Sequence, residues 1–309
     1  MRVTTSTILM IEPVAFRFNP DAARTNRFMC DVPGLEPARA QALALGEFRS
    51  LVETLEREGV EVLVRADTLE PLTPDSIFPN NWVSFHGDGR VFIYPMEPEN
   101  RRLERRADLI DWLREAHGFR VEAVIDLTEH EQKGRFLEGT GSMVFDRRER
   151  IVYACLSPRT TPSLLEAYAE RYGYRLLTFR AVDRTGTAIY HTNVVMAVGS
   201  RTAVICGESI LEETDRRRVL DSLRSTGHEI VDLSMTQLHA FAGNVLELHD
   251  RDGASLIVMS ERARDSLTSA QASVLGAHAR LVSSPIPTIE DCGGGSVRCM
   301  IAEVFLPRD

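Results

Sequence analysis

The sequence predicts an α/β fold built as a ring of five similar units, and three observations support this. A small or amide residue followed by an apolar run recurs about every fifty residues. Four of the five copies continue as a β-hairpin, and each hairpin is followed by a helical pattern and one more short strand. Near-constant spacing of this kind is the signature of a repeated supersecondary unit. The copies begin at Asn81, Ser142, Asn193, Asn244 and Ser296.

Each hairpin is indicated by two apolar runs that flank turn-forming residues. In the first copy, Trp82 to Phe85 and Val91 to Tyr94 flank Gly87-Asp88-Gly89. The same pattern predicts hairpins over residues 143–155, 194–206 and 245–259. In the last copy, Met300 to Leu306 follows three consecutive glycines and is predicted to be a buried strand.

Apolar residues at three- and four-residue spacing predict a helix after each hairpin. The predicted helices are Arg101 to His117, Pro162 to Tyr172, Ile210 to Ser225 and Glu261 to Ala279. The predicted closing strands are Val121 to Leu127, Arg175 to Phe179, Glu229 to Leu233 and Ala279 to Val282. The N-terminal part supplies a strand over Thr7 to Met10, a helix over Pro37 to Glu58 and a strand over Val60 to Val64.

These elements make five ββαβ units, the fifth completed by joining the two ends of the sequence. Units repeated around an axis describe a five-bladed α/β propeller, which we expect to form one domain over residues 1–309. The segment from Glu12 to Pro33 is long for a connection. We interpret it either as a lid over the mouth of the ring or as an ordered surface loop.

The composition limits the function. The chain has 309 residues, 43% of them hydrophobic and 26% charged, as in a typical globular protein. A net charge of −9 argues against a nucleic-acid partner, and the cluster of Arg101-Arg102 and Arg105-Arg106 is interpreted as a solvated face or an anion contact. No apolar stretch is long enough to span a membrane. Five cysteines without tight pairing indicate a reducing compartment, so we expect a cytoplasmic protein. The oligomeric state stays open, a homo-oligomer included.

Polar residues recur where the hairpins begin. In a ring, equivalent positions of the five units surround one axis, so these residues are expected to line a single central site for a small-molecule substrate. A cysteine, a histidine and carboxylates there provide a nucleophile, a general acid or base, and acceptors for N–H groups. The residues are Asp75, Asn81, Glu138, His191, Asn193 and Cys299.

Four of these residues also have a purely structural interpretation, and that of Asn81 is a turn that it forms with Asn80 after Pro79. Glu138 precedes a Gly-Thr-Gly turn that it caps in the simplest case, and His191 follows Tyr190 and suits a core position. Cys299 is equally suited to packing. The other histidines show no metal-ligand spacing, and Cys292 with Cys299 has no second pair, so we expect no metal and no other cofactor.

Four motifs resemble those of the guanidine-modifying enzymes, the five-bladed α/β propellers called penteins, which include arginine deiminases, dimethylarginine dimethylaminohydrolases and agmatine deiminases. The motifs are Asp75-Ser-Ile-Phe with Asn80-Asn81, Leu137-Glu138-Gly139, His191-Thr-Asn193 and Gly293-Gly-Gly-Ser-Val-Arg-Cys299. The resemblance spans essentially the whole chain. Within this amidinotransferase-like superfamily, Phe78-Pro-Asn-Asn-Trp-Val-Ser84 and Tyr190-His-Thr-Asn193 look most like the citrulline utilization hydrolase (CtlX-type) branch.

The resemblance implies a role for each residue. Cys299 matches the nucleophile that attacks the central carbon of a guanidino or ureido group, giving a covalent intermediate. His191 matches the general acid that protonates the leaving amine and then activates water. Glu138 matches the carboxylate that holds substrate N–H groups, and Asp75 matches an acidic substrate contact. Arg101 and Arg159 lie where relatives place arginines that hold the α-carboxylate, for which a guanidinium is suited.

Two asparagines depart from the arginine-specific pattern. Relatives that act on arginine usually carry Asp where this sequence has Asn81, and arginine deiminases carry another where it has Asn193. A guanidinium offers only donors and a positive charge, whereas a ureido group is neutral and presents a carbonyl oxygen to which an amide donates. The sequence therefore predicts hydrolysis of citrulline to ornithine, carbon dioxide and ammonia. The alternatives are an arginine deiminase or dihydrolase and, against the presence of both Cys299 and His191, a non-catalytic propeller.

Overall fold

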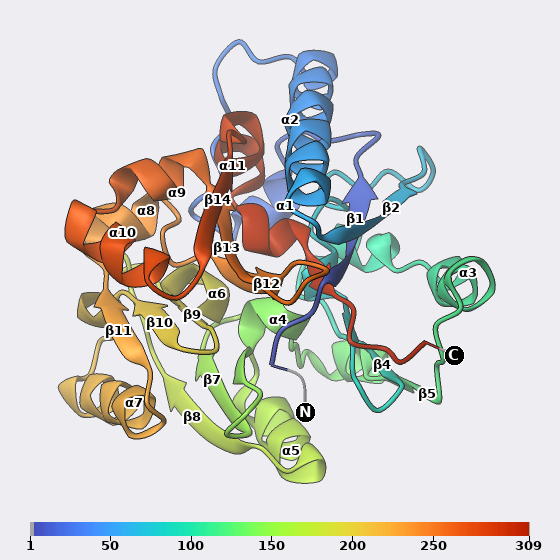
Figure 1. The fold of residues 1–309 in the computed structure, drawn as a ribbon. Helices are drawn as coiled ribbons and strands as arrows, with labels where there is room; N and C mark the ends of the chain where they lie inside the picture. Colours follow the sequence, from blue (N-terminus) through green and yellow to red (C-terminus); the bar gives the residue numbers. More distant parts are fainter. Residues whose placement is uncertain (1–2, 309) are drawn as a thin grey trace.

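The computed structural model describes residues 3–308 and contains five three-stranded sheets arranged in a ring (Figure 1). In every sheet the middle strand pairs antiparallel with one neighbour and parallel with the other. In four sheets a hairpin joins the antiparallel pair and a crossover joins the parallel pair, which makes each a ββαβ unit. In the first sheet the last described strand takes the place of the hairpin partner. The predicted α/β propeller of five such units is confirmed.

The five sheets follow one another along the chain, except that the first also contains the last strand. They are composed of β1 (Thr7–Glu12), β2 (Glu61–Ala66) and β15 (Ala302–Glu303); β3 (Val83–Phe85), β4 (Arg90–Ile93) and β5 (Ala123–Asp126); β6 (Val144–Asp146), β7 (Ile151–Cys155) and β8 (Arg175–Phe179); β9 (Met196–Val198), β10 (Thr202–Ile205) and β11 (Glu229–Asp232); and β12 (Leu246–His249), β13 (Ser255–Ser260) and β14 (Arg280–Ser284).

The ring is closed by pairing between the two ends of the sequence. Strand β1 pairs antiparallel with β15, so that Ile8 lies opposite Glu303 and Leu9 opposite Ala302. On its other edge β1 pairs in parallel with β2. The fifth unit is thus completed by the joined ends, as the repeat predicts.

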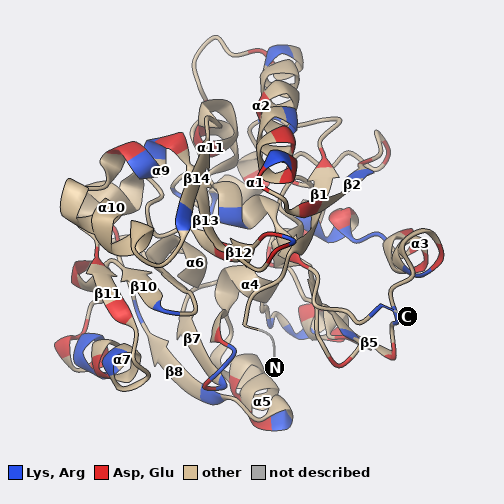
Figure 2. Ribbon diagram, in the orientation of Figure 1, with Lys and Arg blue, Asp and Glu red and all other residues tan. Residues whose placement is uncertain are grey.

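The crossover helices lie on the outside of the ring (Figure 1). Proline stands at the first turn of the helices that start at Pro37 and Pro162, and left-handed glycines end two helices at Gly118 and Gly173. These residues delimit helices because proline suits the first turn and glycine adopts positive φ without strain. Most of the outer helices carry charged residues of both signs (Figure 2). The crossover helices are α2 (Pro37–Arg57), α3 (Asp108–His117), α5 (Pro162–Tyr172), α7 (Glu213–Ser225), and the pair α9 (Glu261–Ser266) and α10 (Ser269–Gly276).

A short helical turn precedes the inner strand of four units. The turns are η1 (Pro79–Asn81), α4 (Gly139–Ser142), α6 (Thr192–Val195) and η5 (Val297–Met300). Strands were predicted over residues 194–198 and 300–306, and both predictions are partly wrong because residues 194–195 and 300 are helical and the last strand spans only Ala302–Glu303. A short buried apolar run does not distinguish a strand from a helical turn. In Figure 1, α4 and α6 lie toward the middle of the ring.

Two predicted helices are interrupted. Residues 101–117 form η2 (Glu99–Glu104) and, after an extended residue at Arg105, α3. Residues 261–279 are divided into α9 and α10 because the Thr268 hydroxyl and the Gln271 side chain form a capping box that starts a new helix. The remaining short elements are α1 (Pro20–Ala23), η3 (Thr128–Lys133), η4 (Gly207–Ser209), α8 (Met235–His239) and α11 (Pro287–Gly293).

Several strands are deeply buried: no residue of β3, β6, β7 or β10 is exposed or partly exposed. Close packing holds such strands rigidly, so the turns that precede them have defined positions. Within the described residues, no helix is both long and apolar enough to cross a membrane. The cytoplasmic location stays a prediction.

Candidate active site

The residues that the sequence selects come together at one end of the inner strands. Six of the eight line a single small cavity: Asp75, Asn81, Arg101, Arg159, His191 and Cys299. The other two contact members of this set, because Glu138 bonds to His191 and Asn193 to Cys299. Six separate segments of the sequence therefore build one site.

Cys299 lies in the turn η5 with its thiol between two amide groups. Its Sγ is 3.4 Å from Nδ2 of Asn193 and 3.2 Å from Nδ2 of Asn244. All three side chains are buried. Two N–H donors at this distance stabilise a thiolate, the reactive form of cysteine, by charge-assisted hydrogen bonds.

Asn244 is the site residue that the sequence analysis missed. It appears there only as the fourth marker of the repeat, without a chemical role. Its position relative to Asn193 is the signal that identifies it, since the two asparagines stand at equivalent points of adjacent units. In the structure the two asparagines are also in contact, because Asn244 Nδ2 donates to the Asn193 carbonyl over 2.9 Å.

The glycine run before Cys299 allows close packing of other residues rather than of another strand. A Cβ at Gly293 would lie 2.8 Å from the Phe78 ring. A Cβ at Gly294, where φ is +59°, would lie 2.6 Å from the backbone nitrogen of Met29. Glycine is therefore required where Phe78 and the segment near Met29 cover η5.

His191 and Glu138 form a buried pair. Nε2 of His191 lies 2.8 Å from Oε2 of Glu138. Burial alone would raise the pKa of Glu138, but the Arg159 charge and the His191 hydrogen bond outweigh it and lower this pKa to about 2. Burial lowers the pKa of His191 to about 4, although Glu138 opposes this shift. At neutral pH the carboxylate is therefore ionised and the imidazole neutral.

This pairing determines which histidine nitrogen carries the proton. An ionised carboxylate only accepts hydrogen bonds, so Nε2 of His191 is protonated and Nδ1 keeps its lone pair. Nδ1 of His191 faces Gly141. A Cβ added at Gly141 would lie 2.8 Å from this nitrogen and 2.5 Å from Nδ2 of Asn81. The absence of a side chain at Gly141 lets the basic nitrogen and the amide approach each other.

Arg101 is buried, so its interpretation as part of a solvated face is wrong. Its Nε and Nη2 donate to Glu104 over 2.8 and 2.9 Å, and Nη1 donates to Oδ1 of Asn81 over 2.8 Å. The carboxylates of Glu104 and Asp75 compensate the buried positive charge of Arg101, and Oδ2 of Asp75 lies 3.7 Å from Nε of Arg101.

The Arg101 contact orients the amide of Asn81. A guanidinium has no acceptor, so the Asn81 oxygen must face it and the Nδ2 group must point the other way. This Nδ2 is buried and has no hydrogen-bond partner within the described residues. A buried donor without a partner is unfavourable by about 1–3 kcal/mol, and a ligand acceptor relieves that cost.

Asp75 presents an unpaired acceptor to the same cavity. Its Oδ2 accepts from Nδ2 of Asn19 over 2.8 Å, while Oδ1 is buried without a partner in the part of the chain that the structure describes. Burial raises the pKa of Asp75, and Arg101 opposes the shift. The site thus offers both a free acceptor and a free donor to a substrate.

The segment from Asn19 to Met29 covers the cavity. The Arg159 side chain donates to the Ala22 carbonyl over 2.7 Å and to the Thr25 hydroxyl over 2.9 Å. Asn26 donates to the Gly294 carbonyl over 3.2 Å. The space left beneath this cover is about 10 Å³, enough for about one water molecule. The predicted lid or loop is therefore an ordered cover over a closed site.

No group of three or more metal-ligating side chains occurs among residues 3–308, and the five cysteines are free. The donors and acceptors around Cys299 are those of an organic polar substrate. The chemistry available is attack by a thiol on a planar carbon with a neutral imidazole as base.

A comparison with protein-family models decides the family. The model for eukaryotic N,N-dimethylarginine dimethylhydrolases matches residues 12–306. The chain belongs to this family. It is thus a pentein hydrolase of the kind that acts on carbon–nitrogen bonds of guanidino compounds through a cysteine nucleophile, which argues against the non-catalytic alternative. The narrower resemblance to the citrulline utilization hydrolase branch stays a prediction. None of the curated proteins compared matches the sequence significantly.

Several solved structures have the same fold as this chain, although their sequence identity to it is low. ArgZ, an arginine dihydrolase of the ornithine–ammonia cycle in cyanobacteria, superposes with a TM-score of 0.74 at 17% identity over 98% of this chain. This chain spans 41% of full-length ArgZ but 99% of its N-terminal domain, solved with product at a TM-score of 0.72 and 18% identity over 97% of this chain. DDAH from Pseudomonas aeruginosa was solved as a cysteine-to-serine variant complexed with citrulline. It superposes with a TM-score of 0.66 at 13% identity, over 98% of this chain and 100% of that one.

Proposed function

We propose that this chain hydrolyses the ureido group of citrulline to ornithine, carbon dioxide and ammonia. One observation carries the choice of substrate: Arg101 turns the oxygen of Asn81 away and leaves its buried Nδ2 as a free donor in the site. A ureido carbonyl oxygen is the acceptor that this donor suits. A guanidinium has no acceptor to offer, so it would leave Asn81 unpaired.

The residues around Cys299 suit a two-step reaction. The thiol loses its proton to Nδ1 of His191 and attacks the ureido carbon, and the protonated imidazole then supplies the proton with which ammonia leaves. The product is a thiocarbamate between Cys299 and the δ-nitrogen of the substrate. Water, deprotonated at Nδ1, cleaves the carbon–sulfur bond and restores the thiol. The released carbamate loses carbon dioxide and gives ornithine.

Asp75 and Glu138 are proposed to hold the substrate N–H groups. Asp75 has a free oxygen for this purpose. Both oxygens of Glu138 are already engaged, by His191, Arg159 and the Glu97 backbone nitrogen. A carboxylate oxygen has two lone pairs, so a further contact with substrate is compatible with the role of orienting His191.

Arg159 is proposed to bind the α-carboxylate of the substrate. Two of its partners, the Ala22 carbonyl and the Thr25 hydroxyl, belong to the covering segment, and its Nη1 also lies 3.4 Å from Oε2 of Glu138. Opening of that segment frees these N–H groups for a carboxylate, a stronger partner. Arg101, in contrast, is engaged by Glu104 and Asn81, which suits it to positioning Asn81 more than to a carboxylate contact.

The second candidate is an arginine deiminase or dihydrolase. The free oxygen of buried Asp75 favours it, because a guanidinium is a set of N–H donors with positive charge. The similar fold of ArgZ, an arginine dihydrolase, is compatible with either substrate.

The test is to incubate the purified chain with citrulline and, separately, with arginine, and to measure ornithine, citrulline and ammonia. We expect ornithine and ammonia from citrulline at a kcat/KM at least about tenfold above that for arginine, the ratio expected from one mispaired buried group. Conversion of arginine without any product from citrulline would overturn the proposal in favour of the second candidate. The Cys299→Ser variant, run in parallel, detects activity from a contaminant.

A further inference from the structure

A second and much larger cavity, of about 900 Å³, lies at the other end of the inner strands. Strand β3 begins after Asn81 and is followed by His86; β15 begins after Cys299 and is followed by Phe305. His86 and Phe305 line the large cavity, whereas Asn81 and Cys299 line the small one. The two cavities share no lining residue. The ring therefore has a separate hollow at the end opposite the proposed active site.

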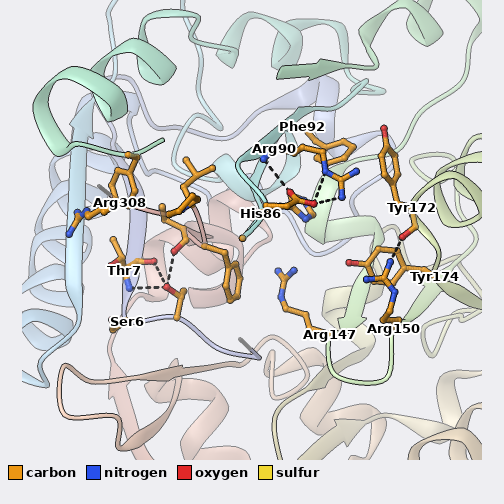
Figure 3. Close-up of a pocket in the computed structure, with 18 of the residues that line it drawn as sticks. Ser6, Thr7, His86, Arg90, Phe92, Arg147, Arg150, Tyr172, Tyr174 and Arg308 are labelled. Carbon is orange, nitrogen blue, oxygen red and sulfur yellow. Dashed lines mark hydrogen bonds and ion pairs between the residues drawn. The ribbon is translucent and has the colours of Figure 1, made fainter. Parts of the chain in front are cut away.

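Arg147 brings a poorly compensated charge into this cavity. Its side chain is 10% exposed, and its guanidinium points toward the middle of the cavity (Figure 3). Of its five N–H donors, one is engaged within the described residues, at 3.5 Å from Glu303. The guanidinium lies over the Phe305 ring in a cation–π contact, with Cζ 4.1 Å from the ring centroid. Four donors of a buried cation are thus left for a ligand or solvent.

The neighbouring arginines add to this positive potential unequally. Arg150 donates to the backbone carbonyls of Gly173 and Tyr172, and no carboxylate among residues 3–308 lies within ion-pair distance of it. Arg90 is neutralised by Asp88, and Arg308 by Glu61. His86 adds no charge at neutral pH, because burial and the Arg147 charge lower its pKa to about 3. Arg150 therefore supplies a positive charge that no described carboxylate pairs, and Arg147 is paired with Glu303 through a single N–H.

Aromatic rings form much of the remaining wall. Phe92, Tyr172 and Tyr174 lie on one side in Figure 3, and Phe305 and Phe119 complete the lining. Arginines already lie over Tyr172 at 4.7 Å and over Tyr174 at 4.9 Å. Rings held in this way are rigid platforms for a planar ligand. The volume is within the range of about 300–1,000 Å³ that is usual for small-molecule sites.

We propose that this second cavity binds a small anion that carries a planar ring, for example a nucleoside monophosphate, with the acidic group on Arg147 and the ring among the aromatic side chains. The free guanidinium donors select an oxyanion. The aromatic lining distinguishes a ring-bearing anion from a bare inorganic one. The site is independent of the hydrolase reaction.

The test is isothermal titration calorimetry of the full chain in a phosphate-free buffer of low ionic strength, with AMP, adenosine and inorganic phosphate as probes. We expect saturable binding of one AMP per chain and at least about tenfold weaker binding of adenosine and of phosphate. Adenosine binding as tightly as AMP would overturn the role of the arginines, and phosphate binding as tightly would overturn the role of the rings. Absence of AMP binding would overturn the whole proposal.

Variants locate the binding. Arg147→Gln is expected to weaken AMP binding at least about tenfold, while Arg217→Gln, an exposed change on α7, leaves it unchanged. Cys299→Ser is expected to bind AMP like the wild type. Equal binding by Arg147→Gln, or competition by citrulline, would contradict the assignment. If Arg147→Gln does not fold, Arg150→Gln serves instead, because that exposed side chain donates to backbone carbonyls and forms no ion pair among the described residues.

Discussion

Nε2 of His191 donates to Oε2 of Glu138 over 2.8 Å, and both side chains are buried at the axis of the ring. In Glu138→Gln the amide can donate to Nε2, which moves the histidine proton to Nδ1 and removes the base. We expect kcat for citrulline to fall about 10²–10⁴-fold. Steady-state kinetics over a pH series measures this. Glu131→Gln, which breaks ion pairs with Arg102 and Arg105 outside the site, is the matched control. An unchanged pH profile in Glu138→Gln would show that Glu138 does not act through His191.

The Cys299→Ser variant is expected to fold and to lose at least about 10³-fold in kcat, because a hydroxyl is a much poorer nucleophile with only a neutral histidine as base. Acid quench of the wild type during turnover, followed by intact-mass measurement, is expected to detect the thiocarbamate on the Cys299 peptide. Cys30→Ser, at an exposed cysteine, is expected to keep full activity. An adduct on any other cysteine would mean that the nucleophile is wrongly assigned.

Asn81→Asp replaces the free amide donor by a carboxylate next to Arg101. We expect kcat/KM for citrulline to fall at least about tenfold more than kcat/KM for arginine, since a carboxylate repels a carbonyl oxygen and attracts a guanidinium. The matched control is Asn80→Asp, the same change at an adjacent buried asparagine that bonds to Thr140 and lies outside the cavity lining. Equal losses for both substrates would make Asn81 a structural residue.

Asn244→Ala removes the N–H that lies 3.2 Å from the Cys299 sulfur. A charge-assisted hydrogen bond contributes about 1.5–3 kcal/mol, so we expect the thiolate to be less stabilised and kcat to fall at least about tenfold. The rate of alkylation of Cys299 by iodoacetamide at pH 7.5, followed by peptide mass spectrometry, measures the reactivity of the thiol. Were alkylation to proceed at the wild-type rate, Asn244 would have no part in activating the thiol.

Acidification is expected to destabilise the fold through its buried neutral histidines. Burial lowers the pKa of His191 to about 4 and that of His86 to about 3, from an ordinary value near 6.5. Between these limits the unfolded chain binds protons that the folded chain does not, so stability falls as pH decreases below about 6.5. Each histidine contributes a slope of about 1.4 kcal/mol per pH unit. Urea unfolding at pH 7, 6 and 5 is expected to show a smaller slope for His86→Asn, and an identical slope would refute this origin.

The periodicity of the sequence was sufficient to predict the ring, because five units with the same turn signals leave few other arrangements. The helix over Pro162 to Tyr172 agrees residue for residue with the structure, since Pro162 and Gly173 signal its two ends. The boundary between α9 and α10 was missed because the Thr268 capping box lies inside a continuous apolar pattern. Start and stop residues therefore predict a helix well when they flank its apolar pattern. They are overlooked when they lie within a continuous apolar pattern.

The site was predictable as a set of residues and less so as a set of contacts. Equivalent positions of the repeat correctly indicated that Cys299, His191 and Glu138 converge. The burial of Arg101 was not predictable, because it depends on Glu104 and on Asp75 brought in from another segment. Asn244 had the same positional signal as Asn193, but its chemistry becomes visible only with the thiol beside it.

The pairing of β1 with β15 has a consequence for how the protein is made. Strand β1 is synthesised before the other strands described and lacks its antiparallel neighbour until residues 302–303 follow. At about 5–20 residues per second, this interval is about 15–60 s. Cys299 precedes β15 directly, so its thiol is the last of the proposed catalytic groups to be synthesised. All strands of the other four sheets are therefore synthesised before the reactive sulfur, so the parts that close the ring and the nucleophile of the site are both added late in synthesis.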